Sequence, residues 1–278
     1  MIIQMDSLGR NGRFANQVFQ FFFLKLVQQK FGCEIRYPYW LGLDIFNITP
    51  SPPVMPTETR VAFEELSGRG DSLELDLMRL GKLLQLCPEN IIDISGYFQY
   101  RTNLLSGHRN LFLETFSISD TLRNEVFQGI KRHNIDLENL IVVHFRAGDY
   151  LSYDGHPYFW APKIDSVIKA INNFGLGQNA TIYLASDDMT YVEAELKRRG
   201  VNVISCHSVF KDLSEVDALC IDFTVMTMAA YLMIANSTFS FLAAMLNNNS
   251  KLMTRPASID GGYIKFEPWS DEILLSSG

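Results

Sequence analysis

The alternation of short apolar runs with helical segments over residues 140–255 constrains the fold more than any other feature of this sequence. LIVVHF at 140–145 is a continuous apolar and β-branched run, typical of a strand in a parallel sheet that is covered on both faces. Four more runs predict strands, at 180–186, 201–205, 231–235 and 251–255. Helical patterns lie between them, at 163–173, 189–199, 215–230 and from residue 238 onwards. Strands that alternate with helices predict an α/β fold with a mainly parallel sheet.

The first 115 residues alternate less regularly and contain most of the prolines. Residue spacing and turn residues predict strands at 1–5, 33–37 and 91–98, helices at 16–31, 72–86 and 117–133, and a loop at 44–60. A polar stretch near 134–139 separates this part from the regular alternation. We therefore expect two domains, 1–136 and 137–278.

The charge balance and the cysteines disfavour several classes of protein. The chain has 24 Lys and Arg residues against 31 Asp and Glu residues, a net charge of -7. Proteins that bind nucleic-acid backbone are more often basic, so we expect no nucleic-acid partner. The four cysteines are widely spaced and form no C-x-x-C pair, which predicts free thiols rather than a disulfide framework or a zinc site.

The most apolar stretch, 223–246, is interrupted by polar residues at 236–240. A membrane-spanning helix needs about 20 mostly apolar residues. We therefore interpret the stretch as a buried helix, a strand, a turn and a second helix. The first residues of the chain resemble neither a signal peptide nor an anchor. The sequence predicts a protein with no integral membrane segment, located in the cytoplasm.

Several predicted strands run directly into compact polar clusters. LIVVHF leads into RAGDY, ATIYLAS into DDM and YLMIA into NSTFS, and the first strand leads toward GRFANQ. Open α/β sheets bind their ligands beyond the carboxyl ends of the strands. We therefore expect these four clusters to converge on one crevice.

His144, Arg146 and Asp149 are the candidate residues at the end of the strand at 140–145. Because side chains alternate between the faces of a strand, His144 and Arg146 share one side. An arginine can bind two phosphate oxygens as a fork, and His144 can donate a hydrogen bond to the same anion. Asp149 either orients Arg146 or accepts a proton. The alternative is an Arg–Asp pair that only closes the turn after the strand.

Two further clusters place polar groups at predicted helix starts. Ser237 and Thr238 offer hydroxyls beside free N–H groups, an arrangement that binds anions. Ser and Thr at that position are also ordinary helix caps. Asp187 and Asp188 begin another helix, where the helix dipole favours acidic residues. The functional alternative for this pair is a carboxylate that accepts hydrogen bonds from a guanine ring or a ribose.

Several common catalytic motifs are missing from the sequence. It contains no G-x-G-x-x-G fingerprint and no G-K-[ST], so hydride transfer on a dinucleotide and a P-loop NTPase are unsupported. No H-E-x-x-H, G-x-S-x-G or D-x-D motif follows a predicted strand. This argues against a metalloprotease, an α/β-hydrolase and a metal-dependent glycosyltransferase of the D-x-D type.

Five segments together resemble the α-1,2-fucosyltransferases of the bacterial type, glycosyltransferase family 11. GRFANQVFQF at 12–21 is similar to their G-R-x-G-N-Q-x-F-Q signature, and VVHFRAGDYL at 142–151 to their H-x-R-R-G-D-Y motif. The other three are SGYFQY (95–100), YLASDDMTYVEAEL (183–196) and DFTVMTMAAYLMIANSTFSFLAAMLN (222–247), which resemble the family's G-Y-F-Q, S-D-D and A-N-S-T-F-S segments. The five occur in the family's order. The departures are Ala15 for a Gly, Ala147 for the second Arg, and Phe241-Leu242 for W-W.

The resemblance implies a GT-B-like fold, in which two Rossmann-like domains face a central cleft. Residues 1–136 would form the acceptor-side domain and residues 137–278 the GDP-sugar-binding domain. The implied reaction is an inverting transfer of L-fucose from GDP-L-fucose to the 2-hydroxyl of a terminal galactose on an oligosaccharide. It would need no cofactor and no divalent metal.

The resemblance also implies the site residues. The donor-binding set is Phe14, Asn16, His144, Arg146, Asp187, Ser237 and Thr238, and the catalytic set is His144, Arg146 and Asp149. Arg146 corresponds to the arginine that related fucosyltransferases aim at the donor diphosphate. Negative charge builds on the β-phosphate as fucose leaves, and cationic and N–H donors stabilise it. The catalytic base, or whether one is needed, stays open, with Asp149 as one candidate.

Alternative functions remain at this point. One is a related GDP-sugar-dependent fucosyltransferase with another linkage or a protein acceptor. Another is a catalytically silent GDP-sugar-binding module, which Ala147 would favour, and a third is a Rossmann-like protein with unrelated ligands. The acceptor is expected to meet the irregular segments 38–70 and 151–162. Aromatic residues of the second segment either stack on sugars or cover the core.

Overall fold

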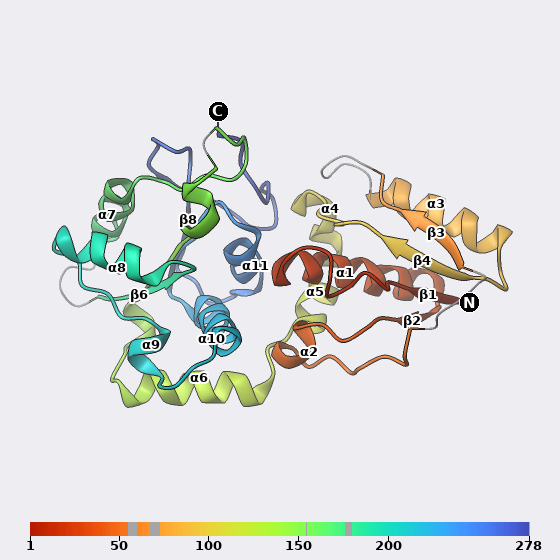
Figure 1. Cartoon of the computed structure of the whole chain (residues 1–278), viewed down its shortest axis with the longest axis horizontal. Helices are drawn as coiled ribbons and strands as arrows, with labels where there is room; N and C mark the ends of the chain where they lie inside the picture. Colours follow the sequence, from red (N-terminus) through yellow and green to blue (C-terminus); the bar gives the residue numbers. More distant parts are fainter. Residues whose placement is uncertain (55–59, 67–72, 154, 176–179, 278) are drawn as a thin grey trace. The chain divides into compact units, whose positions relative to one another are not determined.

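The computed structural model describes residues 1–54, 60–66, 73–153, 155–175 and 180–277. The chain divides into two compact units, Met1–Ser119 and Asp120–Gly278. Each is built around its own sheet, and Figure 1 labels many of their helices and strands. The predicted α/β class with mainly parallel sheets is confirmed.

The first unit contains a four-stranded parallel sheet in the order β2-β1-β4-β3. Its strands are β1 (Ile2–Gln4), β2 (Glu34–Arg36), β3 (Arg60–Glu64) and β4 (Ile91–Ser95). Its α-helices are α1 (Phe14–Phe31), α2 (Gly42–Ile45), α3 (Leu73–Leu86), α4 (Thr102–Leu105) and α5 (Arg109–Thr115), with a short 3₁₀ helix η1 (Ser106–His108). The strand order places β1 and β4 in the centre, where their residues are the most buried.

Helix α1 is buried on nearly every side, because aromatic residues surround it. The ring of Phe23 stacks on Phe98 at 4.1 Å between centroids, and Phe22 meets Phe112 edge-on at 4.8 Å. A helix that is apolar all round belongs inside a core, and each buried phenylalanine contributes about 1.5–3 kcal/mol. The helix ends at Gly32, whose φ of 61° lies in the left-handed region that favours glycine.

The second unit contains a five-stranded sheet in the order β6-β5-β7-β8-β9. Its strands are β5 (Leu140–Phe145), β6 (Thr181–Ser186), β7 (Tyr231–Met233), β8 (Leu252–Pro256) and β9 (Tyr263–Lys265). The first four are parallel, and β9 runs antiparallel to β8. Its α-helices are α6 (Asp120–Arg132), α7 (Ile164–Asn173), α8 (Met189–Arg198), α9 (Cys206–Val209), α10 (Glu215–Met228) and α11 (Thr238–Leu246), and its 3₁₀ helices are η2 (Leu137–Asn139) and η3 (Gly148–Leu151).

Strand β5 is covered on both faces, as its apolar composition predicts. Ile141, Val143 and Phe145 pack into one hydrophobic cluster with residues of α7 and α8. Helices α10 and α11 contact each other and lie on the other side of the sheet (Figure 1). All six residues of β5 are buried. This burial fixes the strand firmly and, with it, the residues that follow its carboxyl end.

The structure corrects the prediction of a strand at 201–205. Only Ile204 pairs with the sheet there, through an isolated bridge to Tyr183. The preceding Val201 is bonded instead to the end of α8, through its N–H to the Leu196 carbonyl. Ser205 already caps the short helix α9. The pattern reasoning also missed β3, α5 and β9, which are short.

The apolar stretch at 223–246 forms the end of α10, then β7, a turn and α11, as the sequence predicts. Within the described ranges, none of the helices combines the length and the apolarity that crossing a membrane requires. All four cysteines are free thiols, as expected. By its contacts α6 belongs to the second unit, whereas the expected domain boundary at residue 136 lies after this helix.

Candidate functional site

The carboxyl ends of three neighbouring strands meet at one edge of the second sheet. Strand β5 pairs with β6 on one side and with β7 on the other. The register places Phe145 opposite Ser186, the last residues of β5 and β6. Arg146 and Asp187, which follow them, therefore emerge side by side. The predicted convergence of RAGDY with the DDM cluster is what this pairing produces.

Arg146 is held between two carboxylates. Its Nη1 lies 2.5 Å from Oδ2 of Asp187, and its Nη2 lies 2.5 Å from Oδ1 of Asp149. The guanidinium also lies over the ring of Tyr150, 5.1 Å from the centroid. Its side chain is 14% exposed. A guanidinium has more N–H donors than these two contacts use, so it can still receive an anionic ligand.

Asp187 is tied to the turn that carries Arg146. Its Oδ1 accepts the N–H of Ala147 at 2.8 Å, while Oδ2 meets Arg146. A Cβ atom at position 148 would lie 2.2 Å from Oδ2 of Asp187, so only Gly148 allows this approach. Arg146, Ala147 and Gly148 thus all lie against the carboxylate of Asp187. The contact with a guanine or a ribose that we expect for Asp187 stays a prediction. The structure shows that Asp187 also holds Arg146 in place through an ion pair.

Position 147 belongs to the core rather than to the site. The side chain of Ala147 is fully buried in the cluster with α7 and α8. A long cationic side chain at this position would displace apolar neighbours. In this chain Arg146 is therefore the cation at the end of β5, together with the backbone groups around it.

His144 is a neutral residue inside the second unit. Burial lowers the pKa of His144 to about 3, so that it carries no charge near neutral pH. Its ring lies 5.4 Å from that of Phe239, the second residue of α11. Its Nδ1 has no hydrogen-bond partner among the described residues. His144 therefore offers a neutral polar nitrogen beside the start of α11, and not a positive charge.

Of the two alternatives that the sequence left open at the start of α11, the structure shows the helix cap. Ser237 is an ordinary cap, since its Oγ accepts the N–H of Phe239 at 3.3 Å. Thr238 begins the helix and is half-buried. The first turn of any helix also leaves N–H groups without partners inside the helix, and the helix dipole is positive there. The structure thus shows the cap at Ser237, and the anion site expected at Ser237 and Thr238 stays a prediction.

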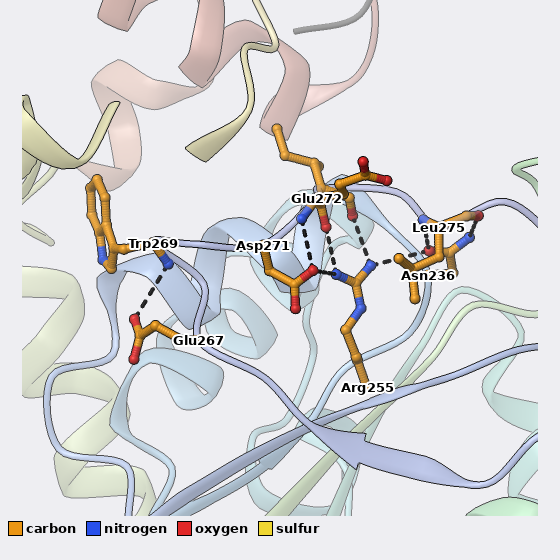
Figure 2. A network of polar contacts seen from close by, with 8 residues as sticks. Asn236, Arg255, Glu267, Trp269, Asp271, Glu272 and Leu275 are labelled. Atoms are coloured by element: carbon orange, nitrogen blue, oxygen red, sulfur yellow. Dashed lines mark hydrogen bonds and ion pairs between the residues drawn. The ribbon is translucent and has the colours of Figure 1, made fainter. Parts of the chain in front are cut away.

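Asn236, just before this cap, has a different role from a cap. Its Nδ2 donates to the carbonyls of Tyr158 and Leu275, both at 2.9 Å, and its Oδ1 accepts the N–H of Leu275 at 2.8 Å. Figure 2 shows these contacts with Leu275 beside the side chain of Arg255. One amide thus joins the C-terminal segment and the segment at 157–160 to the start of α11.

Arg255, which the sequence reasoning missed, completes this network (Figure 2). Its Nη1 donates to the carbonyl of Glu272 at 2.5 Å and lies 3.4 Å from Oδ1 of Asp271. Its Nη2 donates to the carbonyl of Ile273 at 3.3 Å. Arg255 is fully buried, and burial lowers its pKa. The only signal in the sequence is a charged residue inside an apolar strand, followed by a proline.

Phe14 and Asn16 lie in the first unit. Phe14 is buried, and its ring stacks on Phe46 at 5.9 Å. Oδ1 of Asn16 accepts a hydrogen bond from Nε2 of Gln99 at 2.7 Å. This bond links two of the segments that carry the family resemblance, GRFANQ and GYFQ. The donor-binding role expected for Phe14 and Asn16 stays a prediction.

The described residues include no group of three or more His, Cys, Asp or Glu side chains placed to hold a metal ion. What the second unit brings together is Arg146, the start of α11 and the neutral His144, at the carboxyl edge of a parallel sheet. Such an arrangement suits an anionic group, because a guanidinium and free N–H groups both attract negative charge.

Comparisons with solved structures show the fold. The structure is similar to that of an α-1,6-fucosyltransferase, NodZ, soaked with GDP-fucose, with 13% identity, a TM-score of 0.59, and coverage of 96% of this chain and 98% of that chain. A NodZ fucosyltransferase from Bradyrhizobium gives 12% identity, a TM-score of 0.61 and the same coverage. POFUT1 in complex with GDP-fucose gives 14% identity and a TM-score of 0.62 over 91% of this chain and 96% of that chain.

The comparisons by sequence give one family. No curated protein matches the chain. The model of glycosyl transferase family 11 matches residues 82–260, which is more than half of the chain and includes β5, β6, β7 and the start of α11. The chain therefore belongs to glycosyl transferase family 11.

Proposed function

We propose that this glycosyltransferase moves L-fucose from GDP-L-fucose to the 2-hydroxyl of a terminal galactose on an oligosaccharide, with inversion at the anomeric carbon. The observation that carries the proposal is Arg146 at the carboxyl end of β5, next to the strand β7 that leads into the start of α11. The motif order from GRFANQ to ANSTFS supports the α-1,2 linkage. The similar structures of NodZ, soaked with GDP-fucose, and of POFUT1, in complex with GDP-fucose, support the donor.

The geometry supplies the charge that the reaction needs. As the bond between fucose and the β-phosphate breaks, negative charge grows on the phosphate oxygens. Preorganised donors aimed at such charge are commonly the largest contribution to catalysis. We assign Arg146 to the β-phosphate and the start of α11, with Ser237 and Thr238, to the same diphosphate. The neutral His144 contributes a polar nitrogen and no charge.

Asp149 is our candidate for the base that takes the proton of the acceptor hydroxyl. In the structure Oδ1 of Asp149 lies 2.5 Å from Nη2 of Arg146. A phosphate that draws Arg146 toward itself weakens this contact. The carboxylate then loses one ion-pair partner and can accept a hydrogen bond from the acceptor hydroxyl. Donor binding would in this way prepare the base for the acceptor.

We also propose which part of the chain binds each substrate. Residues 137–278 hold the donor, and residues 1–136 contribute to the acceptor side. The reaction proceeds in the cytoplasm without a divalent metal. The second unit supports the donor assignment, because it contains Arg146, Asp187, Ser237 and Thr238 at one sheet edge.

The test is an assay of the full chain with GDP-L-fucose and three classes of acceptor. These are a β-galactoside, an N-acetylglucosamine oligosaccharide and a folded polypeptide domain, each with and without EDTA. We expect transfer to the galactoside, unaffected by EDTA, with an α-1,2 linkage by NMR of the product. Transfer only to one of the other two acceptors would overturn the linkage. If the protein neither transfers fucose nor hydrolyses GDP-fucose, the proposed activity is overturned.

A further inference from the structure

A cluster of aromatic rings lies next to Arg146 in the segment after η3. We call Tyr150, Tyr153, His156 and Phe159 the aromatic cluster. Phe159 is its centre, with ring centroids 5.4 Å from Tyr150, 5.8 Å from Tyr153 and 4.1 Å from His156. The His156 and Phe159 rings are stacked at 10°. Because the guanidinium of Arg146 lies over Tyr150, the cluster begins at the catalytic edge of the sheet.

The cluster is not simply part of the core. Tyr153 is 45% exposed, and His156 and Phe159 are half-buried. Trp160, in the same segment, is buried and donates its Nε1–H to the carbonyl of Leu275 at 3.2 Å. The sequence left open whether the aromatic residues of this segment stack on sugars or cover the core, and the structure shows that they differ in burial. Trp160 covers the core, whereas the aromatic cluster shows ring surface to solvent.

His156 is fixed in position and in tautomer. Its Nδ1 lies 3.1 Å from the backbone N of Tyr158 and 3.0 Å from that of Phe159, so it accepts both N–H groups. A ring nitrogen that accepts hydrogen bonds carries no proton, so the proton is on Nε2. The Nε2–H is a donor for which the described residues supply no partner. A stacked ring whose remaining donor is fixed in place is preorganised to bind a ligand.

We propose that the aromatic cluster is the subsite for the acceptor sugar, and that it binds the pyranose ring of a terminal galactoside. This inference rests on the proposed function, since it names the surface that would receive the acceptor of that reaction. One face of galactose presents only C–H groups, which pack on aromatic rings. Its edge presents hydroxyls, which accept hydrogen bonds from the Tyr153 hydroxyl and the His156 Nε2–H.

The chemistry of the cluster favours a sugar over the guanine of the donor, which would also stack on aromatic rings. The edge of guanine that is used for recognition carries mainly N–H donors, and proteins bind it with carboxylate or amide acceptors. The four members of the aromatic cluster include neither a carboxylate nor an amide. The hydroxyls of a sugar accept as readily as they donate, which suits the donors of Tyr153 and His156.

The main variant is Tyr153→Ala, and its matched control is Tyr191→Ala. Tyr191 lies on α8 in the same unit, is 40% exposed and takes no part in the aromatic cluster. For Tyr153→Ala we expect the KM for the galactoside to rise about 5- to 10-fold, the scale of a lost aromatic contact. The KM for GDP-fucose and the slow hydrolysis of GDP-fucose by water should stay as in the wild type. Tyr191→Ala should change none of these values.

Two conservative variants separate stacking from hydrogen bonding. Tyr153→Phe keeps the ring and removes the hydroxyl, so it should raise the galactoside KM less than Tyr153→Ala does. His156→Asn keeps an acceptor near the two backbone N–H groups and removes both the ring and the Nε2–H. It should raise the galactoside KM with little change in melting temperature. A general loss of structure would instead raise both KM values and lower the melting temperature.

A binding measurement tests the subsite apart from turnover. Saturation-transfer NMR with lactose should show contacts to the galactose ring protons for the wild type and for Tyr191→Ala, and weak contacts or none for Tyr153→Ala. Equal signals from all three proteins would overturn the subsite, as would a rise in the GDP-fucose KM in place of the galactoside KM. Lactose binding without any use of GDP-fucose would keep the subsite and overturn the proposed function.

Discussion

Arg146 and Arg255 lie in the same unit, close to the ends of parallel strands and beside carboxylates, but their surroundings differ. Arg146 contacts two side-chain carboxylates and keeps some exposure. Arg255 is fully buried, and most of its hydrogen bonds go to backbone carbonyls of the C-terminal segment. Its guanidinium also lies over the rings of Phe241 and Phe266, 5.4 Å from each centroid.

The difference indicates that the charge of Arg146 serves ligand binding, whereas the charge of Arg255 stabilises the fold. Arg146 can exchange a carboxylate partner for a phosphate at modest cost, because its surroundings stay polar. The carbonyls around Arg255 have no comparable substitute, since a buried acceptor without a donor costs about 1–3 kcal/mol. We therefore expect changes at Arg146 to affect catalysis with little loss of stability, and changes at Arg255 to do the reverse.

The largest expected effect is that of Arg146→Ala on turnover. Loss of a donor to the transition state lowers kcat by about 10²–10³, while the melting temperature should change little. Arg146→Lys should restore only part of the activity, because lysine cannot form the bidentate fork. Steady-state kinetics on purified, folded protein check this. A variant that keeps more than about a tenth of the wild-type kcat would refute the assignment.

The converse variant, Arg255→Met, should act on stability. It leaves the carbonyls of Glu272 and Ile273 without their donor, and we expect the free energy of unfolding to fall by about 3 kcal/mol. Urea unfolding measures this, and kcat below the unfolding transition should stay within about threefold of the wild type. A stable variant with a large loss of kcat would mean that Arg255, too, serves the reaction directly.

The variant Asp187→Asn sharpens the comparison, because it removes the negative charge of one of the two carboxylates that contact Arg146. The amide oxygen can still accept the Ala147 N–H, so the turn should survive. Arg146 loses one of its two charged partners and is held less firmly. We expect the KM for GDP-fucose to rise about tenfold, and Asp187→Ala, which also loses the acceptor for the N–H, to raise it further. An unchanged donor KM in both variants would reject a role for Asp187 in the donor site.

His144 predicts a smaller effect, on the pH dependence of stability. The ordinary pKa of histidine is near 6.5, and burial lowers that of His144 to about 3. Between these values the unfolded chain binds the proton and the folded chain does not. The free energy of unfolding contributed by His144 therefore falls as the pH falls, by at most about 1.4 kcal/mol per pH unit.

Asp222 opposes this effect and has to be separated from it. Burial raises the pKa of Asp222 from 3.8 to about 7, so its contribution to stability is lost as the pH rises through this range. The comparison of the wild type with His144→Gln cancels the Asp222 contribution, which both proteins share. From roughly pH 6 to pH 4 the variant should gain about 2 kcal/mol relative to the wild type. A constant difference in urea unfolding would show that His144 is not buried as a neutral group.

The sequence predicts the elements of the second unit well where burial leaves a simple pattern. LIVVHF becomes β5 with the predicted bounds, because every one of its residues is buried. The segment 201–205 has a similar composition, yet Ile204 alone pairs, since the chain turns into α9 at Ser205. Of these five residues only Ser205 is buried and Asn202 is exposed, so the apolar pattern at 201–205 did not indicate a covered strand.

The candidate site could be located from the sequence more easily than its contacts. The ends of the apolar runs indicate Arg146 and Asp187 separately, but their ion pair depends on the register between β5 and β6. The role of Arg255 depends on a C-terminal segment that no local pattern connects to β8. For the aromatic cluster, the sequence shows only that the segment is rich in aromatic residues. The structure adds the two hydrogen bonds to His156 Nδ1, which fix the position of its ring.

The central claim is that Arg146 binds the diphosphate of the donor, and calorimetric titration with GDP tests it most directly. The matched control is Arg198→Ala, which removes an arginine that is 67% exposed on α8 and pairs with Glu195. We predict that Arg146→Ala weakens GDP binding at least about 30-fold, the scale of a lost charge-assisted pair, and that Arg198→Ala binds GDP like the wild type. Equal affinity of Arg146→Ala and the wild type for GDP would contradict the account.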